Sequence, residues 1–405
     1  MKILFISQFF WPEDFRINDI ALSLKKKGHE VTVLTGIPNY PYGHYYQGYG
    51  LFKKRVENFN GIKIFRVPLF PRKKGRWWEL IINYLSFMIS AALFVPFFCH
   101  KKIDIIFFNQ SPFSEGVPAI FLSAFTKAKV IYWAQDLWPR TLSATGNIRS
   151  KKILEIIDIF IKFIYKKSDL ILVQSRAFIK EIINQGADPD IVSYFPNSAE
   201  KLYQPVIVKE DSGKRKIMPR GFCVTFAGNI GAAQDFETIL SAAEILKENN
   251  HIHWVILGVG RMFTWVQSEV IKRGLEKNVR LLGRHPMETM PEFFALSDAL
   301  LVILKKEPIF AFTIPGKVQS YLACAKPVIA AMEGEGARII MESGAGFACP
   351  PEDPKSLAMS ILKMYELPDV ERKKMGLKGK KYFNEHFEFN NLLNRLERWM
   401  GELKR

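Results

Sequence analysis

The sequence has few cysteines and lacks the two commonest nucleotide-binding motifs. Its four cysteines, Cys99, Cys223, Cys324 and Cys349, stand far apart, with no CxxC pair and no metal-ligand spacing. We therefore expect small buried thiols in a reducing compartment rather than disulfides or a metal centre. Neither GxGxxG nor a Walker loop is present, so any phosphate site must use another pattern.

The chain also shows no N-terminal signal sequence. Its apolar start, Ile3–Ile6, is too short for one, and the stretch Trp11–Asp14 follows almost at once. We therefore expect a cytoplasmic protein. Two domains are expected, because 405 residues with 48% hydrophobic side chains exceed the usual size of a single core.

Long apolar stretches without charge are absent with one exception, Leu80–Cys99, which is long enough for a membrane span. Asn83, Ser86 and Ser90 share one helical face, and Pro96 interrupts the end of the stretch. We interpret it as the crossover helix of a βαβ unit whose start dips into a membrane surface. A true membrane span and a buried core helix remain open alternatives.

Positive charge is plentiful: the net charge is +17, and residues 1–205 carry most of the excess. One basic cluster, Arg72–Arg76, stands directly before Trp77 and Trp78. Such a face suits an anionic membrane or a nucleic acid, whereas a solvated lysine-rich face is the simpler interpretation. Because the aromatic residues fall in loops and an apolar helix, we expect no nucleic acid. We predict that segment 71–99 faces the inner side of the cytoplasmic membrane.

Apolar runs that alternate with helical patterns predict an α/β chain. The predicted strands are residues 2–6, 29–35, 61–69, 103–108, 130–134, 170–174, 222–227, 254–258, 279–282, 299–303 and 327–331. We predict two tandem doubly wound, Rossmann-like domains with a cleft between them. The first covers residues 1–205 and the second residues 222–369, joined by a charged linker at 206–221. A helical segment at 370–405 packs back toward the first domain.

The most informative stretch is Phe222–Leu240, where a buried strand runs into the turn Gly228–Gly231 and then into a helix. A strand, a glycine turn and a helix start direct free backbone N–H groups and a helix dipole at an anion. Asn229 and Gln234 can donate from their side chains. The sequence thus favours a phosphate site, although an ordinary tight turn gives the same pattern.

In the first half, candidate side chains follow the predicted strands, because ligands of such sheets bind at the carboxyl ends of parallel strands. They are Trp11, Asp14 and Arg16 in the first loop, Tyr40 in loop 38–49, Asn109, and Asp136 with Trp138. Loop 38–49 suits a lid or a plain surface loop, and Asp136 suits a ligand site or a helix cap. The triplet Asp188–Asp190 matches a metal-binding DxD only superficially, so we predict a turn and no metal.

The order of motifs along the chain tells more than any single motif. The pieces are Gly28–Thr35, Ser168–Val173, Pro196–Asn197, Ala227–Gly228, Gly258–Gly260, Leu282–Arg284, Ser297–Ala299, Gly316–Lys317 and Lys326–Ala330. In this order they resemble the retaining GT-B glycosyltransferases of family 4. Pro38–Pro41, Asp136–Pro139, Gly228–Gln234 and Thr313–Lys317 look most like the WbuB subgroup of bacterial O-antigen L-fucosamine transferases and its colanic-acid relatives.

The resemblance implies that the second domain holds a UDP-sugar donor and that the first approaches a polyprenyl-diphosphate-linked sugar acceptor. It implies metal-independent hexosyl transfer with retention, with N-acetyl-L-fucosamine as the expected sugar, in O-antigen, lipopolysaccharide or other surface polysaccharide biosynthesis. No cofactor is expected, and the protein would associate peripherally with the inner membrane.

Residue roles are assigned from the same resemblance. The donor-binding residues are Gly228, Asn229, Ile230, Gly231, Gln234, Gly258, Arg284, Gly316, Lys317 and Ser320. The catalytic candidates are Asp136, Lys317, Asp14 and Arg16, and the acceptor-binding candidates are Trp11, Tyr40, Asn109 and Trp138.

The sequence departs from the family pattern at several charged positions. Asn229 replaces the Arg of the phosphate loop, and Gln234 lies near the place of its Lys. The usual Glu-x7-Glu pair becomes Phe312 and Ser320, and the His that usually precedes Asp136 is Gln135. The alternative hypothesis is therefore a non-catalytic nucleotide-sugar-binding or scaffold subunit of a polysaccharide assembly complex.

Overall fold

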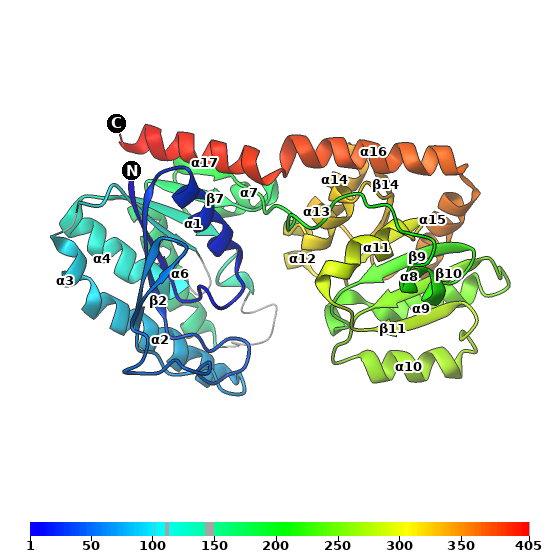
Figure 1. Ribbon diagram of the computed structural model, residues 1–405, viewed down its shortest axis with the longest axis horizontal. Helices are drawn as coiled ribbons and strands as arrows, with labels where there is room; N and C mark the ends of the chain where they lie inside the picture. Colours follow the sequence, from blue (N-terminus) through cyan, green and yellow to red (C-terminus); the bar gives the residue numbers. More distant parts are fainter. Residues whose placement is uncertain (101, 110–112, 142–149, 405) are drawn as a thin grey trace. The chain divides into compact units, whose positions relative to one another are not determined.

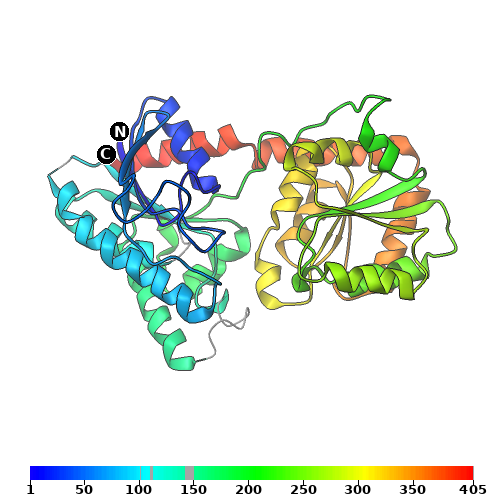
Figure 2. The same cartoon turned by 60° about the horizontal axis from the view of Figure 1, so that its bottom comes forward.

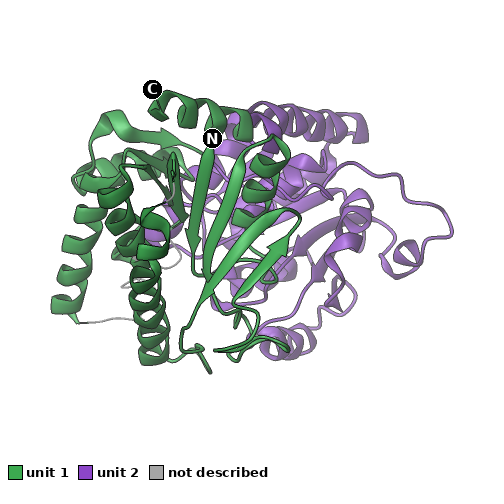
Figure 3. Cartoon of the chain, turned by 60° about the vertical axis from the view of Figure 1, so that its left-hand side comes forward, with its two compact units in different colours: residues 1–195, 392–405 green, residues 196–391 purple. Residues whose placement is uncertain are grey.

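The structure is a computed structural model that describes residues 1–100, 102–109, 113–141 and 150–404. It divides into two compact units, each built on its own sheet (Figure 3). Unit 1 holds residues 1–195 together with 392–405, and unit 2 holds residues 196–391. The two largely parallel sheets confirm the predicted fold of two Rossmann-like α/β domains.

Unit 1 contains an eight-stranded sheet with the order β3-β4-β2-β1-β5-β6-β7-β8. Its strands are β1 (Lys2–Ser7), β2 (Glu30–Gly36), β3 (Val56–Phe59), β4 (Ile62–Val67), β5 (Ile105–Asn109), β6 (Lys129–Ala134), β7 (Leu170–Val173) and β8 (Val192–Tyr194). All neighbours pair in parallel except β3 with β4, which form an antiparallel hairpin. Chain order reverses between β1 and β5, so their carboxyl ends flank a topological switch point, where ligands of such sheets bind.

Helices pack around this sheet. They are α1 (Arg16–Lys26), α2 (Trp77–Phe94), α3 (Pro96–Cys99), α4 (Gly116–Thr126), α6 (Lys151–Lys167), α7 (Arg176–Asn184) and α17 (Phe389–Lys404), with short 3-10 turns η1 (Phe113–Glu115) and η2 (Pro189–Ile191). Pro96 ends α2 as predicted and opens α3 at a position where proline needs no N–H partner. The Asp188 carboxylate accepts from the Asp190 N–H at 3.0 Å, which confirms the predicted turn.

The last helix, α17, belongs to unit 1 and lies beside α1 and the start of β1 (Figures 1 and 2). The Glu397 carboxylate accepts from Lys27 Nζ and contacts His29 Nε2, each at 2.7 Å. Arg395 donates to the Tyr194 carbonyl of β8 at 2.7 Å. A buried stripe of Leu392, Leu393, Leu396 and Met400 supplies the apolar contact. Because α16 (Asp369–His386) belongs to unit 2, the predicted segment 370–405 is divided between the units.

Unit 2 contains a six-stranded, wholly parallel sheet with the order β11-β10-β9-β12-β13-β14. Its strands are β9 (Phe222–Ala227), β10 (Ile252–Leu257), β11 (Val279–Gly283), β12 (Ala299–Ile303), β13 (Val328–Ala331) and β14 (Gly346–Cys349). β9 and β12 follow the predicted bounds, because both strands are buried apolar runs. Chain order reverses between β9 and β12, so this pair forms the switch point of unit 2.

Unit 2 begins earlier than the sequence predicted, because Ala199 and Tyr203 pack into its core and the Tyr203 ring stacks on Phe294. Its helices are α8 (Gly213–Ile217) within the predicted linker, α9 (Phe236–Ile245), α10 (Phe263–Lys272), α11 (Met290–Ala295), α12 (Pro308–Phe312), α13 (Gly316–Ala323), α14 (Glu335–Ser343), α15 (Pro354–Glu366) and α16, with turns η3 (Ala232–Gln234) and η4 (Met287–Thr289).

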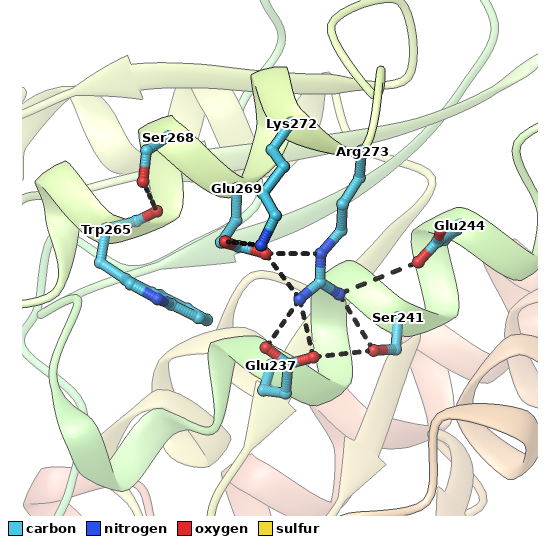
Figure 4. Close-up of polar contacts among 8 residues, drawn as sticks. All are labelled: Glu237, Ser241, Glu244, Trp265, Ser268, Glu269, Lys272 and Arg273. Carbon is cyan, nitrogen blue, oxygen red and sulfur yellow. Dashed lines mark hydrogen bonds and ion pairs between the residues drawn. The ribbon is translucent and has the colours of Figure 1, made fainter.

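Helix α9, which follows the glycine turn Gly228–Gly231, is held in place by contacts with α10. Arg273, directly after α10, donates to Glu237 of α9 at 2.8 Å and to Glu269 of its own helix at 2.9 Å (Figure 4). It also donates to the Ser241 hydroxyl of α9 at 3.2 Å. A guanidinium with several acceptors holds two helices in fixed register. The start of α9 is thus fixed where it leaves the turn.

Candidate functional site

The glycine turn of unit 2 lies at the switch point of its sheet. β9 ends at Ala227, and the turn is held by two backbone bonds, from Gly228 N to Leu257 O at 2.8 Å and from Ile230 N to Val259 O at 3.0 Å. The Lys305 N–H after β12 donates to Ala233 O at 2.9 Å. The turn, which continues β9, is therefore fixed by the ends of β10 and β12, in the place where doubly wound sheets bind ligands.

Close backbone approach requires a glycine at position 258, whereas Gly231 lies under two flexible side chains. A Cβ on Gly258 would lie 1.9 Å from Gly228 O, and Gly258 has φ +136°. A Cβ on Gly231 would lie 2.6 Å from Asn229 Nδ2 and 3.1 Å from Gln234 Oε1. The structure therefore brings together the predicted residues Gly228, Asn229, Gly231, Gln234 and Gly258, and the two amide side chains lie over the Gly231 backbone.

Lys317 reaches the same turn from α13. A Cβ on Gly228 would lie 2.5 Å from Lys317 Cε and 2.9 Å from its Nζ. The ammonium lies 3.7 Å from the centroid of the Phe226 ring in β9. Burial lowers the pKa of Lys317 to about 7, although part of the residue remains open to solvent. A basic group therefore stands beside the turn, where an anion can reach it.

The remaining predicted donor residues differ in their freedom to bind. The Ile230 side chain is fully buried, and its N–H and C=O are used by Val259 and Met262. Ser320 donates to the Gly316 carbonyl within α13 at 3.1 Å. Arg284 is exposed after β11, and Gly316 is exposed at the start of α13. In this structure Ile230 and Ser320 support the site from within the protein, whereas Arg284 and Gly316 present themselves to solvent.

Unit 1 has a second polar cluster, at its own switch point. Ser7 at the end of β1 donates to the Asn109 side chain at the end of β5 at 3.0 Å. The Gln8 N–H donates to Glu115 Oε1 at 2.6 Å, and Gln8 Nε2 donates to Asn83 Oδ1 at 2.6 Å. Burial raises the pKa of Glu115 well above its ordinary value. Its second oxygen is buried and has no partner among the described residues, as expected of a carboxyl that is protonated or awaits a ligand.

A second buried carboxyl, Glu13, connects two loops of unit 1. Its Oε1 accepts from the backbone N–H groups of Asn39 and Tyr40, each at 2.7 Å. Burial raises the pKa of Glu13 to about 7, against the opposing effects of these hydrogen bonds and of Arg66. The loop after β1 and loop 38–49 are thereby joined, so the latter is held against the former rather than left as a free surface loop.

Asp136, which follows β6, belongs to the same region as Glu115. Burial raises the pKa of Asp136 to about 6, which the Trp138 indole partly offsets. The charges of Asp136, Glu115 and Arg72 all act on the Tyr84 hydroxyl of α2, although burial is the main cause of its raised pKa. The Arg72 guanidinium lies 4.9 Å from the centroid of the Tyr40 ring. Carboxyl groups, a cation and aromatic rings thus gather at this end of the sheet, a combination typical of a small-molecule site.

The remaining predicted site residues of unit 1 differ in how far they are buried. Trp11 stacks on Phe59 of β3 at 4.4 Å, and its carbonyl accepts from buried Arg66. Trp138 is largely buried, and its carbonyl accepts from Gln185. Asp14 is exposed, and Arg16 starts α1 half-buried. Trp11 and Trp138 therefore mainly hold unit 1 together, whereas Asp14 and Arg16 lie at its surface.

The sequence analysis overlooked Glu13 and Glu115. A carboxylate in a loop or before a helix usually marks a solvated face or a cap. The only available signal was position, because both residues follow the carboxyl ends of strands at the switch point. Their burial depends on contacts with Gln8, Asn39 and Tyr40, which sequence spacing does not reveal.

One surface of unit 1 is apolar. Of the described residues, α2 is the one helix of sufficient length and hydropathy to cross a membrane, and only 22% of that window is buried. The buried stripe of α2 includes Glu79, Asn83 and Phe87, whereas Ile89 and Leu93 are 54% and 74% exposed. The Asn83 amide donates inward to the Phe70 carbonyl at 2.6 Å. The polar side of α2 thus faces the protein, and much of its apolar side faces out, the reverse of an ordinary surface helix.

The comparisons with known families agree with this geometry. Residues 15–198 match the family described as "Glycosyl transferase 4-like domain". Residues 208–382 match the family described as "Glycosyl transferases group 1". These two matches, one largely within each unit, cover most of the chain.

Named relatives point the same way. The chain is 31% identical to the glycosyltransferase WbjE of Pseudomonas aeruginosa over 271 residues, which span 62% of this chain and 64% of WbjE. It is 23% identical to WcaI of Escherichia coli K12, named for glycosyl transfer in colanic acid biosynthesis, over 91% of this chain and 93% of WcaI. HepE of Anabaena, solved in complex with UDP, superposes with a TM-score of 0.73 at 15% identity, over 99% of this chain and 100% of HepE.

The fold and the two domain families together define a GT-B glycosyltransferase. More specifically, the chain belongs to the glycosyltransferases in which a glycosyl transferase 4-like domain precedes a group 1 domain.

Proposed function

We propose that this protein transfers a sugar, with retention, from a UDP-sugar to a lipid-diphosphate-linked acceptor in the synthesis of a bacterial surface polysaccharide. The observation that carries the proposal is the turn at the switch point of unit 2, where Lys317 stands beside the backbone of Gly228–Gly231. A basic side chain, a glycine turn and a nearby helix start together suit a diphosphate. The name of WcaI, which refers to colanic acid biosynthesis, supports the assignment to a surface polysaccharide.

The proposed mechanism relies on stabilising the leaving group. UDP gains negative charge as the glycosidic bond breaks, so donors fixed beside its β-phosphate lower the barrier. Lys317 and the Asn229 amide supply such donors, and the exposed Arg284 is a further cation at this edge of the sheet. In this proposal Lys317 fills the role that a metal ion has in other transferases, and no metal or other cofactor is needed.

We assign the acceptor to unit 1. The Asp136 carboxylate orients the acceptor hydroxyl, while Tyr40 and Arg72 contact the acceptor near the Asn109 end of the sheet. We further propose N-acetyl-L-fucosamine as the donor sugar, on the motif resemblance alone. Asp14 and Arg16 remain second candidates for contact with the sugar, because both stand at the surface after β1.

We propose that the protein associates peripherally with the inner face of the cytoplasmic membrane through α2. Ile82, Leu85, Ile89 and Leu93 form an exposed apolar stripe, and Trp77 and Trp78 begin the helix. Arg72, Lys73, Lys74 and Arg76 precede it, where they can meet anionic headgroups. A polyprenyl-linked acceptor lies in that surface, so the same contact would bring enzyme and acceptor together.

A nucleotide screen tests the donor class. Purified protein is heated with UDP, GDP or ADP, and we expect only UDP to raise the melting temperature, because a ligand that binds the folded state stabilises it. A response to GDP alone would overturn the donor while leaving the fold in place. Stabilisation by no nucleotide would instead favour a scaffold protein.

The catalytic role is tested with Lys317→Ala. We expect kcat for sugar transfer to fall by about 10²-fold or more, because one lost donor to the leaving group has an effect of that size. The matched control is Lys363→Ala, since Lys363 also packs over a phenylalanine ring but is exposed on α15. Activity of Lys317→Ala within about threefold of the wild type contradicts the assignment.

A further inference from the structure

We propose that a nucleoside diphosphate enters the turn of unit 2 together with a proton, which Lys317 takes up as the ligand binds. The inference rests on the proposed function, because it assigns the diphosphate to Gly228–Gly231. It adds that Lys317 is neutral in the free site and charged in the occupied site, so donor binding weakens as the pH rises.

The first observation is that Lys317 has no counter-charge. Within the described residues, Nζ makes neither a hydrogen bond nor an ion pair, and its recorded contact is the Phe226 ring. Neither Asp235, which directly precedes α9, nor Lys305 after β12 contributes to the pKa of Lys317, which burial alone lowers. An ammonium in such surroundings loses hydration without gaining a partner, and this favours its neutral form.

The groups around Lys317 do not supply a charge either. On α13, the Tyr321 hydroxyl binds the backbone of Ala227, accepting from its N–H at 3.1 Å. Burial keeps that phenol neutral by raising its pKa above the ordinary value. Lys317 also occupies the first turn of α13, where the positive end of the helix dipole disfavours a second positive charge. Among the residues that the structure describes, no carboxylate therefore offsets a charge on Lys317.

A diphosphate supplies the missing charge. Its oxygens beside Nζ favour the ammonium form and raise the pKa of Lys317 back toward the ordinary value for lysine. The unliganded pKa of about 7 means that at pH 8 most free protein has neutral Lys317. Binding at that pH then removes about one proton from solution, and the apparent affinity falls by about tenfold for each pH unit above 7.

Isothermal titration calorimetry with UDP measures the proton directly. Titrations at about pH 8 in buffers of different ionisation enthalpy give the number of protons bound with each UDP. UDP itself contributes little, because its terminal phosphate loses its second proton at a pKa of about 6. We expect uptake of about one proton by the wild type, and little uptake near pH 6, where Lys317 is already charged.

Three variants separate the possible origins of the proton. Lys317→Arg retains a permanent charge, so we expect UDP binding without proton uptake. Lys317→Met should bind UDP weakly and also take up no proton, with its folding checked by melting temperature. Lys363→Met, an exposed lysine over the Phe347 ring, should behave as the wild type does.

The outcomes distinguish this inference from the proposed function. UDP binding by the wild type without proton uptake at pH 8 overturns the inference and leaves the donor class intact. Proton uptake that persists in a folded Lys317→Arg assigns the proton elsewhere and also overturns it. If UDP does not bind the wild type at any pH, the proposed function fails and the inference fails with it.

Discussion

Asp136, Glu13 and Glu115 are carboxyl groups that unit 1 holds in low-dielectric surroundings, which disfavour their charged forms. Such burial is rare unless a partner or a ligand compensates. Glu13 has backbone partners for one oxygen, whereas its other oxygen and Glu115 Oε2 have none among the residues that the structure describes. Buried carboxyl groups with raised pKa values beside a switch point are typical of a binding site.

The raised pKa of Asp136 predicts a pH dependence of the reaction. Its pKa is raised to about 6, so the carboxylate is charged above that pH and becomes neutral below it. If this carboxylate orients the acceptor hydroxyl, kcat/KM for the acceptor should fall as the pH drops through about 6. Asp136→Asn should lower kcat/KM by about 10²-fold and remove this acid limb, because the amide does not titrate. Transfer to a lipid-linked acceptor, measured between about pH 5 and 8, checks both effects.

Asp190→Asn is the matched control, because Asp190 also lies in unit 1 but is exposed and outside the proposed site. We expect its pH profile to follow that of the wild type. An acid limb that survives in Asp136→Asn, or that disappears in Asp190→Asn, would transfer the role to another carboxyl.

At the scale of elements, α2 has its polar stripe turned inward. Asn83 is fully buried and bonds to Gln8 in the loop after β1, so the helix is fastened to the polar cluster of unit 1. Because α2 is attached to the protein through its polar side, its apolar side remains exposed and can contact a lipid membrane. Helix α4 packs against α2 and also against α6. Two of its phenylalanines, Phe121 and Phe125, are exposed. The apolar surface is therefore wider than one helix.

This arrangement predicts weaker membrane binding when the outer stripe is made polar. The double variant Ile89→Gln, Leu93→Gln should bind anionic phospholipid vesicles at least about tenfold more weakly than the wild type. The reason is that neither glutamine gains the free energy that an apolar side chain gains when it leaves water for lipid. Both residues are exposed, so stability should change little. Co-sedimentation with vesicles measures the partition. Leu377→Gln, an equally exposed leucine on α16 of unit 2, serves as control, and equal partition of all variants would contradict the membrane role of α2.

The elements also show what sequence can and cannot predict. β9 and β12 match their predicted bounds, because an apolar run between turn residues is a local signal. β3 was missed because half of its residues face solvent, and its pairing with β4 depends on the hairpin. β14 begins at Gly346, where a Cβ would lie 1.7 Å from Val328 O. The close approach of the two backbones requires glycine here, and because glycine is a weak strand former, the sequence pattern did not predict this strand.

The candidate site divides in the same way. The Gly228–Gly231 turn was predictable, since strand, glycines and helix follow one another in sequence. Lys317 came from the family resemblance, and its position beside Gly228 is a tertiary contact between residues 89 positions apart. Glu13 and Glu115 were not predictable, because nothing local distinguishes a buried carboxyl from a solvated one.

At the scale of the whole molecule, the chain crosses from unit 1 to unit 2 after residue 195 and returns at residue 392. α17 then completes unit 1 through an apolar stripe and through Glu397, which binds Lys27 and His29. The hydrogen bond from Lys27, with a smaller contribution from His29, lowers the pKa of Glu397. This ion pair therefore stabilises unit 1 above the ordinary pKa of glutamate, and the stabilisation is lost as the pH falls through the lowered pKa.

Glu397→Gln should therefore reduce the stability of unit 1 modestly. The pair is about one-third exposed, so we expect a loss below about 1 kcal/mol and a decrease of melting temperature of about 1–3 °C at neutral pH. The difference from the wild type should vanish in acid, where both side chains are neutral. Scanning calorimetry measures it, and Glu402→Gln, an exposed position on the same helix, should show no change. A difference that persists at low pH would assign the effect to packing instead of charge.

The return of α17 also has a consequence during synthesis. Residues 1–195 leave the ribosome first, but the helix that covers α1 and β8 follows only after the roughly 200 residues of unit 2. At about 5–20 residues per second this interval lasts on the order of 10–40 s. Throughout it, the surface that will receive Leu392, Leu396 and Met400 stays bare on the nascent chain. The first unit to emerge is thus among the last to be completed, and in the interval it presents an apolar strip to which chaperones can bind.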